Sequence, residues 1–168
     1  EQLILESSHD IIWPEFPENT AAGLCYTSGT TGNPKGALYS HRSTVLHALT
    51  TSLNLGPSLG DGMKVLPVVP LFHVNAWGLP YAAPLTGASL IFPGPNLDGA
   101  SLFDLMDQEN VNSAWGVPTV WLGLLEEIRK QERVPSQFQN VVIGGSAAPK
   151  SMIEEFESLG ITVCHAWG

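Results

Sequence analysis

Short apolar runs alternate with segments of helical periodicity along most of the chain, and this alternation constrains the fold more than any other feature. The runs are too short for core helices and are rich in β-branched and aromatic residues, which suits buried strands. Strands separated by amphipathic helices form right-handed βαβ units. The sequence therefore predicts an α/β fold with a mostly parallel sheet flanked by helices. The predicted strands are Ala22–Tyr26, Gly36–Tyr39, Lys64–Val69, Ala88–Phe92, Ser113–Val117, Asn140–Ile143 and Ile161–Ala166.

Helices are predicted in four of the intervening segments. In the first, Val45, Leu49 and Leu53 share one stripe, as expected of an amphipathic helix. Ser101 opens the second with Ser-x-x-Asp, a near relative of the capping box. Pro149 suits the first helical position of the last. The predicted helices are His41–Leu53, Ser101–Glu109, Thr119–Arg133 and Lys150–Leu159.

Length and composition fit one folded domain. With 168 residues, 43% of them apolar and only 14% charged, the chain is neither disordered nor a coiled coil. Its 17 glycines and 13 prolines interrupt every apolar run before it reaches membrane-spanning length. We expect an extended segment over residues 1–20 and an α/β unit over residues 21–168. Glu1–Asp10 holds no basic residue, which argues against a signal or transit peptide.

The distribution of charge excludes some partners. A net charge of −9 repels nucleic acid and anionic membrane surfaces. From Asn19 to Leu97, however, the only acid is Asp61. This depletion indicates either a buried core segment or a bound anion that carboxylates would repel. Cys25 and Cys164 lie in apolar surroundings, which predicts reduced thiols and a cytoplasmic protein.

A loop of small and hydroxyl-bearing residues follows the first predicted strand. Every residue from Thr27 to Gly32 is Gly, Ser or Thr, and Pro34, Lys35 and Gly36 close the pattern. Glycines let the backbone approach a ligand, hydroxyl and amide groups donate to oxyanions, and the lysine adds a cation. The loop is neither a Walker A motif nor Gly-x-Gly-x-x-Gly. It indicates a polyphosphate site, and the alternative is a hydroxyl-rich hairpin loop.

The eleven residues Tyr-Thr-Ser-Gly-Thr-Thr-Gly-Asn-Pro-Lys-Gly from Tyr26 resemble the signature of the adenylate-forming, or AMP-binding, superfamily. The segments 70–77, 144–149 and 166–168 resemble its next motif, its adenine-side loop and the first half of a third motif. In order and spacing the chain is most similar to medium- and long-chain fatty acyl-CoA synthetases. The resemblance implies a partial large N-terminal domain, without the C-terminal domain.

The resemblance also implies a two-step reaction. A fatty or other carboxylic acid attacks ATP to give an acyl-adenylate and pyrophosphate, and coenzyme A then displaces AMP. Developing charge on the leaving pyrophosphate calls for preorganised donors. The family's Thr-Glu pair, whose acid would hold Mg²⁺, would follow Gly168, so the isolated chain is expected to be inactive. A homodimer is expected of the full-length enzyme. The expected phosphate-site residues are Thr27, Ser28, Gly29, Thr30, Thr31, Gly32, Lys35 and Gly36.

The resemblance assigns the adenine site to the segment after the predicted strand Asn140–Ile143. Small residues there would let a flat ring lie against the backbone, and an aromatic side chain could stack on it. The alternative is a tight turn in which Ser146 caps the next helix. The expected adenine-site residues are Gly145, Ser146, Ala147, Ala148, Pro149, Trp167 and Gly168.

His73 is the candidate catalytic residue. It follows a predicted strand at the carboxyl edge of the sheet, where it could hold the substrate carboxylate near the α-phosphate. Trp77 could wall or gate an acyl tunnel, and the alternative for both is ordinary packing. Val117, Pro118 and Thr119 could line the same tunnel or simply start a helix. The remaining histidines lack the spacing of metal ligands, so no metal site is assigned to side chains.

Three hypotheses stay open on the sequence alone. The first is a segment of a fatty-acid–CoA ligase, with an aromatic, sulfur-bearing or amino acid as alternative substrates. The second is a nucleotide- or phosphate-binding module without chemistry of its own. The third is a domain whose exposed core surface pairs with another chain.

Overall fold

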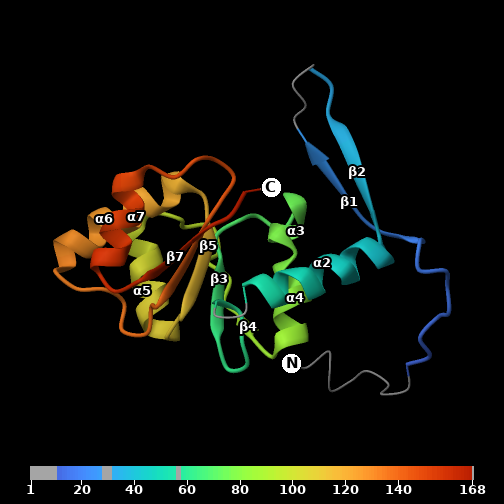
Figure 1. Cartoon of the computed structure of the whole chain (residues 1–168), viewed down its shortest axis with the longest axis horizontal. Coiled ribbons are helices and arrows are strands. Elements are labelled where there is room, and N and C mark those ends of the chain that lie inside the picture. Colours follow the sequence, from blue (N-terminus) through green and yellow to red (C-terminus); the bar gives the residue numbers. More distant parts are fainter. Residues whose placement is uncertain (1–10, 28–31, 56–57, 168) are drawn as a thin grey trace.

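A five-stranded parallel sheet forms the centre of the molecule (Figure 1). The computed structural model describes residues 11–27, 32–55 and 58–167. The strand order is β4-β3-β5-β6-β7, and every neighbouring pair in this sheet is parallel. This confirms the α/β fold and the parallel sheet predicted from the sequence. The strands are β3 (Lys64–Pro67), β4 (Ser89–Leu90), β5 (Ser113–Gly116), β6 (Asn140–Ile143) and β7 (Thr162–His165).

Helices cover both faces of this sheet (Figure 1). One face packs on α5 (Gly99–Glu109), α6 (Pro118–Gln131) and α7 (Lys150–Ser158). The other face packs on α2 (His41–Asn54) and α4 (Leu79–Thr86). Alternate strand residues divide between the two cores. In β5, for example, Ala114 faces α5–α7 and Trp115 faces α2 and α4.

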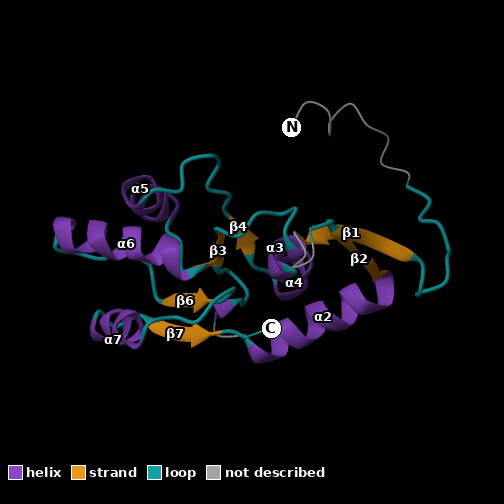
Figure 2. Cartoon of the chain, turned by 90° about the horizontal axis from the view of Figure 1, so that it is seen from above, coloured by secondary structure: helices purple, strands orange, loops and turns teal. Residues whose placement is uncertain are grey.

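The first two strands form a separate antiparallel hairpin. β1 (Ala21–Thr27) pairs with β2 (Lys35–Ser40), and the hairpin lies on the same side of the sheet as α2 and α4 (Figure 2). The mostly parallel sheet predicted from the sequence is thus formed by the other five predicted strands, without these two. They are joined by a short loop, and a short connection allows only antiparallel pairing, whereas a parallel pair needs a long crossover.

Two helical elements escaped prediction. α4 carries Pro80 in its first turn and Pro84 in its interior, which mask the helical pattern. It is preceded by α3 (Val74–Trp77), a single turn whose four residues all have positive φ, from 46° to 56°. A left-handed turn of non-glycine residues has no sequence signature, because only glycine adopts this conformation without steric cost.

Helix starts differ from prediction where the capping residue was misjudged. α5 begins at Gly99, because the carboxylate of Asp98 accepts the amide proton of Ser101 at 3.0 Å. These hydrogen bonds from Ser101 hold the pKa of Asp98 below its usual value. Ser101 is thus inside the helix and does not cap it. Pro149 is the N-cap residue of α7 and lies one position before the first helical residue.

The apolar stripe of α2 faces solvent. Val45, Leu49 and Leu53 are exposed, whereas Ala48 and Thr51 are the buried residues of this helix. The reading of the acid-poor segment as core is therefore wrong for this helix. Residues 11–17 form no helix or strand, and the ring of Phe16 contacts that of His41 at 4.5 Å between centroids. Among the described residues, no helix has the length and apolar content needed to cross a membrane.

Candidate functional site

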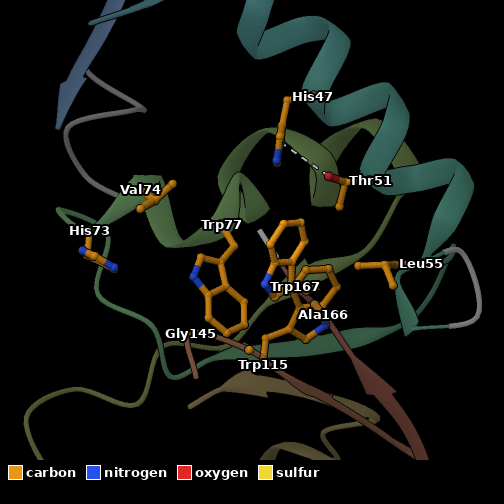
Figure 3. A pocket seen from close by; sticks show the side chains of 11 residues that line it. His47, Thr51, Leu55, His73, Val74, Trp77, Trp115, Gly145, Ala166 and Trp167 are labelled. Carbon is orange, nitrogen blue, oxygen red and sulfur yellow. Dashed lines mark hydrogen bonds between the residues drawn. The ribbon is translucent and has the colours of Figure 1, made fainter. Parts of the chain in front are cut away.

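The strand order places a crevice at the carboxyl ends of the strands in the parallel sheet. The chain leaves β3 toward β4 but leaves β5 toward β6, on the opposite side. Ligands of open parallel sheets bind at the carboxyl ends of the strands where the direction reverses in this way. A cavity of about 440 Å³ lies there (Figure 3). Its lining residues are His47, Thr51, Leu55, His73, Val74, Trp77, Trp115, Gly144, Gly145, Ala166 and Trp167.

Segments that are distant in the sequence meet in this cavity. His73 and Trp77 follow β3, Gly145 follows β6 and Trp167 follows β7. Because these strands are parallel members of one sheet, with β5 between β3 and β6, their carboxyl ends lie on the same side of the sheet. The structure thus brings together four of the candidate residues that the sequence assigned to acid binding, adenine binding and the acyl tunnel.

His73 and Trp77 lie at the two ends of the left-handed turn. The amide of His73 donates to the carbonyl of Pro70 at 3.0 Å, and its own carbonyl accepts from Ala76 at 3.0 Å. Its imidazole is exposed toward the cavity (Figure 3). Left-handed geometry costs about 1–2 kcal/mol per non-glycine residue, so the turn is a strained segment beside the cavity.

The glycine pair after β6 makes room for Trp77. A Cβ atom on Gly144 would lie 3.0 Å from the indole of Trp77 and 3.2 Å from the carbonyl oxygen of Ala166. A Cβ atom on Gly145 would lie 3.0 Å from the side chain of Val117, and the φ of +79° at this residue also favours glycine. A flat ring does lie against this backbone, and it is the indole of Trp77.

The rest of the predicted adenine-side loop is accessible. Ser146, Ala147 and Pro149 are exposed, and the amide of Ala148 donates to Nε2 of His165 at 3.4 Å. No side chain caps α7, so the alternative role of Ser146 as a helix cap is not observed. Trp167 is 99% exposed, which leaves its ring free to stack on a ligand.

The predicted phosphate loop spans the tip of the β1–β2 hairpin. Ser28, Gly29, Thr30 and Thr31 lie outside the described residues, as does Gly168 of the adenine set. The described members of the loop are Thr27, Gly32, Lys35 and Gly36, and none of them lines the cavity.

The described residues at the two ends of the loop are accessible to solvent. Thr27 ends β1, Lys35 begins β2, and both are exposed. Gly32 has a φ of +96° and open space around the position of a Cβ atom. The described ends of the loop therefore belong to the two strands of a hairpin, and neither of them opens a helix.

One predicted group lies beside the cavity. Val117 is the N-cap residue of α6, Pro118 is buried in its first turn, and Thr119 is exposed. None of the three lines the cavity, although Val117 supports Gly145 from behind.

Seven lining residues were not assigned to a site by the sequence analysis, and three of these, Val74, Gly144 and Ala166, belong to segments that it singled out. His47, Thr51 and Leu55 recur every four residues along α2 and its C-terminal end, so they share one face. This spacing was a signal that could have been read. Trp115 lies in a strand predicted as buried and Val74 in the unpredicted turn, and neither carries such a signal.

Among the described residues, the lining carries no carboxylate and no lysine or arginine. The titratable side chains of this described lining are those of His47 and His73. The carboxylates of Asp98 and Asp107, whose pKa values are lowered by hydrogen bonds from Ser101 and Arg133, belong to α5, on the opposite face of the sheet. Within the described ranges, no three His, Cys, Asp or Glu side chains come together as a metal-ligand set.

Comparison with known proteins identifies relatives over the whole chain. A profile of the family described as AMP-binding enzyme matches residues 5–168. The medium-chain-fatty-acid–CoA ligase of Ectopseudomonas oleovorans is 54% identical over all of this chain, which spans 31% of that protein. The 3-methylmercaptopropionyl-CoA ligase of Ruegeria lacuscaerulensis is 50% identical, with the same coverage of 100% and 31%.

A solved structure has the same fold. The o-succinylbenzoate coenzyme A synthetase of Bacillus subtilis, in complex with AMP, superimposes with a TM-score of 0.80 at 27% identity. The match covers 99% of this chain and 34% of that one. In sequence and in structure, the chain therefore corresponds to about a third of the proteins that it resembles.

Proposed function

Because this chain belongs to the AMP-binding enzyme family, we propose that it forms part of a ligase that activates a fatty acid with ATP and transfers it to coenzyme A. In the first step a carboxylate oxygen attacks the α-phosphorus of ATP. The bond to the bridging oxygen of the β-phosphate breaks, and pyrophosphate leaves with the electron pair. In the second step the thiol sulfur of coenzyme A attacks the acyl carbon, loses its proton and displaces AMP.

The phosphate loop binds the leaving pyrophosphate in this proposal. Hydroxyl groups of Thr27, Ser28, Thr30 and Thr31 donate to its oxygens, and Lys35 offsets the charge that develops as the bond breaks. Gly29, Gly32 and Gly36 give the backbone the close approach that a polyphosphate needs. The exposure of Thr27 and Lys35 and the open space at Gly32 support this assignment.

The cavity receives the acid. The observation that carries this proposal is the lining beside His73, which is uncharged and largely aromatic. It lies at the carboxyl ends of the strands, where the strand order reverses. His73 holds the carboxylate for attack, as either a neutral donor or a cation. The acyl chain then lies along Trp77 and the neighbouring wall, where burial of its methylenes stabilises binding.

The adenine ring binds on the other side of Trp77, along residues 145–149. Ser146 and the small residues around it are exposed and leave room for a flat ring. Trp167 offers an open aromatic face for stacking. Gly168 completes this set in the proposal.

Other parts of the reaction depend on groups outside this set. Mg²⁺, when bound, offsets charge on the phosphates, and no step of the proposal depends on a metal ligand from the described residues.

We also propose a cytoplasmic location and a homodimer for the full-length enzyme. Cys25 and Cys164 are both free, and burial raises the pKa of the Cys164 thiol, which is consistent with a reducing compartment.

Pyrophosphate exchange into ATP tests the proposal. The protein expressed from its complete reading frame should exchange pyrophosphate in the presence of octanoate, and Lys35→Ala should lower the rate by about 10²-fold, because a preorganised partner of the leaving group is lost. Lys130→Ala is the matched control, since Lys130 is an exposed cation on α6, away from the cavity. Binding of ATP, AMP and pyrophosphate that does not depend on a carboxylic acid, with no exchange, would instead indicate a nucleotide-binding module.

The acid itself is a second question for the same assay. The 50% identity to a 3-methylmercaptopropionyl-CoA ligase favours a short sulfur-bearing acid as the alternative substrate. We expect octanoate and palmitate to support exchange at lower concentrations than 3-(methylthio)propionate, because longer chains bury more methylenes. The reverse order would assign the site to the short acid.

A further inference from the structure

A second cavity lies next to the first, and two residues belong to both linings. The smaller cavity has a volume of about 180 Å³ and is bounded by β2, α2 and the α3–α4 segment. His47 and Val74 are the residues common to both linings. We propose that the imidazole of His47 is a partition that closes the acyl cavity and thereby limits the length of the acid. This inference rests on the proposed function of the larger cavity.

The ring of His47 is held in place by two contacts. A hydrogen bond of 3.4 Å joins its Nδ1 atom to Oγ1 of Thr51, one turn further along α2 (Figure 3). On the other side the ring packs against Gly78, where a Cβ atom would lie only 2.6 Å from Nδ1. The glycine therefore leaves the ring the space that it occupies between α2 and the start of α4.

The smaller cavity suits the methyl end of an acyl chain. In the part of the chain that the structure describes, its lining contains no Asp, Glu, Lys or Arg, so an apolar chain that enters it desolvates none of these charged groups there. The residues that line it without lining the larger cavity are Tyr39, Ser43, Thr44, Asn75, Gly78 and Tyr81. Two of them contribute phenol rings, against which methylenes pack favourably.

Of the two residues that line both cavities, His47 is the better one to substitute in a test. Val74 belongs to the left-handed turn, with a φ of 49°, so a substitution there would change backbone strain as well as volume. His47 lies within a regular helix and is exposed to the space on both sides of it. Shortening its side chain therefore removes the partition with little effect on the backbone.

The test compares acids of increasing length. Binding of hexanoate, octanoate, decanoate, laurate and palmitate is measured by the fluorescence of the cavity tryptophans, in the protein from the complete reading frame and in its His47→Ala variant. Because each buried methylene contributes about fourfold in affinity, the ratio of long-acid to short-acid affinity should rise by about fourfold for each carbon that enters the smaller cavity. Pyrophosphate exchange with the same acids should shift toward longer chains in parallel.

Three control variants make the test specific. His47→Leu keeps a similar volume without ring nitrogens and should keep the length preference of the parent protein. Thr44→Leu fills part of the smaller cavity from α2 and should change nothing alone, but it should reverse the shift when combined with His47→Ala. His47→Ser replaces His47→Ala if the alanine variant does not fold.

The outcomes separate this inference from the proposed function. A parent protein that neither binds these acids nor exchanges pyrophosphate overturns both. A parent protein that does both, with an unchanged length preference in a folded His47→Ala or His47→Ser variant, overturns the partition alone. A shift that Thr44→Leu fails to reverse also overturns it, because the added length would then lie elsewhere.

Discussion

The two sides of the parallel sheet differ in how completely they bury their apolar residues. On the side of α5, α6 and α7, Trp121, Phe103 and Phe156 are almost completely buried. On the side of the hairpin and α2, Leu24, Leu38 and a whole stripe of the helix are exposed. The first side thus has an almost completely buried core. On the second side, most of the candidate phosphate loop and one wall of the cavity belong to the hairpin and α2, and these elements have few buried contacts.

This difference bears on function. Regions with few buried contacts open locally at low free-energy cost, and ligand-binding segments are drawn from such regions. In the β1 strand only Cys25 is buried, and its thiol donates to Oδ1 of Asn75 at 3.3 Å. This hydrogen bond anchors the hairpin to the α3 turn. We expect the positions of the hairpin and of the cavity wall to respond to ligands more than the sheet does.

Replacing a buried tryptophan should have the largest effect. Trp121 is completely buried in α6, and its Nε1 atom donates to the carbonyl of Gly116 at 3.2 Å. Trp121→Ala should lower the free energy of unfolding by about 3–5 kcal/mol, because it leaves a cavity and removes the hydrogen bond from the indole to Gly116. Urea denaturation measures this loss. Trp13→Ala is the matched control, since Trp13 is 79% exposed, and a similar loss in both variants would refute the contrast between the two sides.

A close helix contact should give the next largest effect. α5 crosses α6 so closely that a Cβ atom on Gly99 would lie 2.0 Å from the carbonyl oxygen of Gly123. Gly99→Ala should cost about 1–3 kcal/mol, since the helices must move apart. Thermal unfolding checks this expectation. In Gly160→Ala the new methyl group meets open space, so only the positive φ of +78° opposes it and the loss should be smaller.

The ion pairs on the well-packed side should give a smaller, pH-dependent effect. Asp107 accepts hydrogen bonds from Arg133 at 2.7 Å and from the amide of Ser136 at 2.9 Å, and these hold its pKa below the ordinary 3.8. A lowered pKa in the folded state means that the stabilisation is fully present above the ordinary value. It is lost as the pH falls through the folded pKa.

Asp107→Asn should therefore reduce stability near neutral pH and flatten its decline in acid. Urea denaturation at a series of pH values measures both effects. Glu18→Gln is the control. Glu18 pairs with Arg42 on the hairpin side, and both side chains are more than half exposed, so this ion pair should contribute little to stability. If the two variants respond equally to acid, Asp107 contributes nothing specific.

The smallest effect is expected on the exposed stripe of α2. Leu53 is 84% exposed, so Leu53→Ser in the 168-residue chain should change the free energy of unfolding by less than about 0.5 kcal/mol. Leu102→Ala, at a completely buried position of α5, should cost about 2–5 kcal/mol under the same conditions. A large loss in Leu53→Ser would show that this stripe packs against another surface in solution.

The sequence predicted the well-packed side better than the other side. β6 was predicted with its observed bounds, and α6 within two residues at each end, because buried strands and amphipathic helices have strong periodicity. On the other side, the stripe of α2 has the same periodicity but faces solvent. Periodicity states that apolar residues share a face and does not state what covers that face.

The candidate site was predictable where strand ends define it. His73, Trp77, Gly145 and Trp167 meet because they follow parallel strands of one sheet, whose carboxyl ends lie on the same side. His47 and Trp115 could not be assigned in this way, since their approach depends on how α2 packs across the sheet. The roles proposed for these residues and for the phosphate loop stay predictions that the experiments above address.

The left-handed turn between His73 and Gly78 has a mechanical consequence. Its four residues would each gain about 1–2 kcal/mol in right-handed geometry, so surrounding contacts must hold the backbone against that gain. Loss of those contacts would let the turn relax toward right-handed geometry. The imidazole of His73 and the indole of Trp77, at its two ends, would then move together.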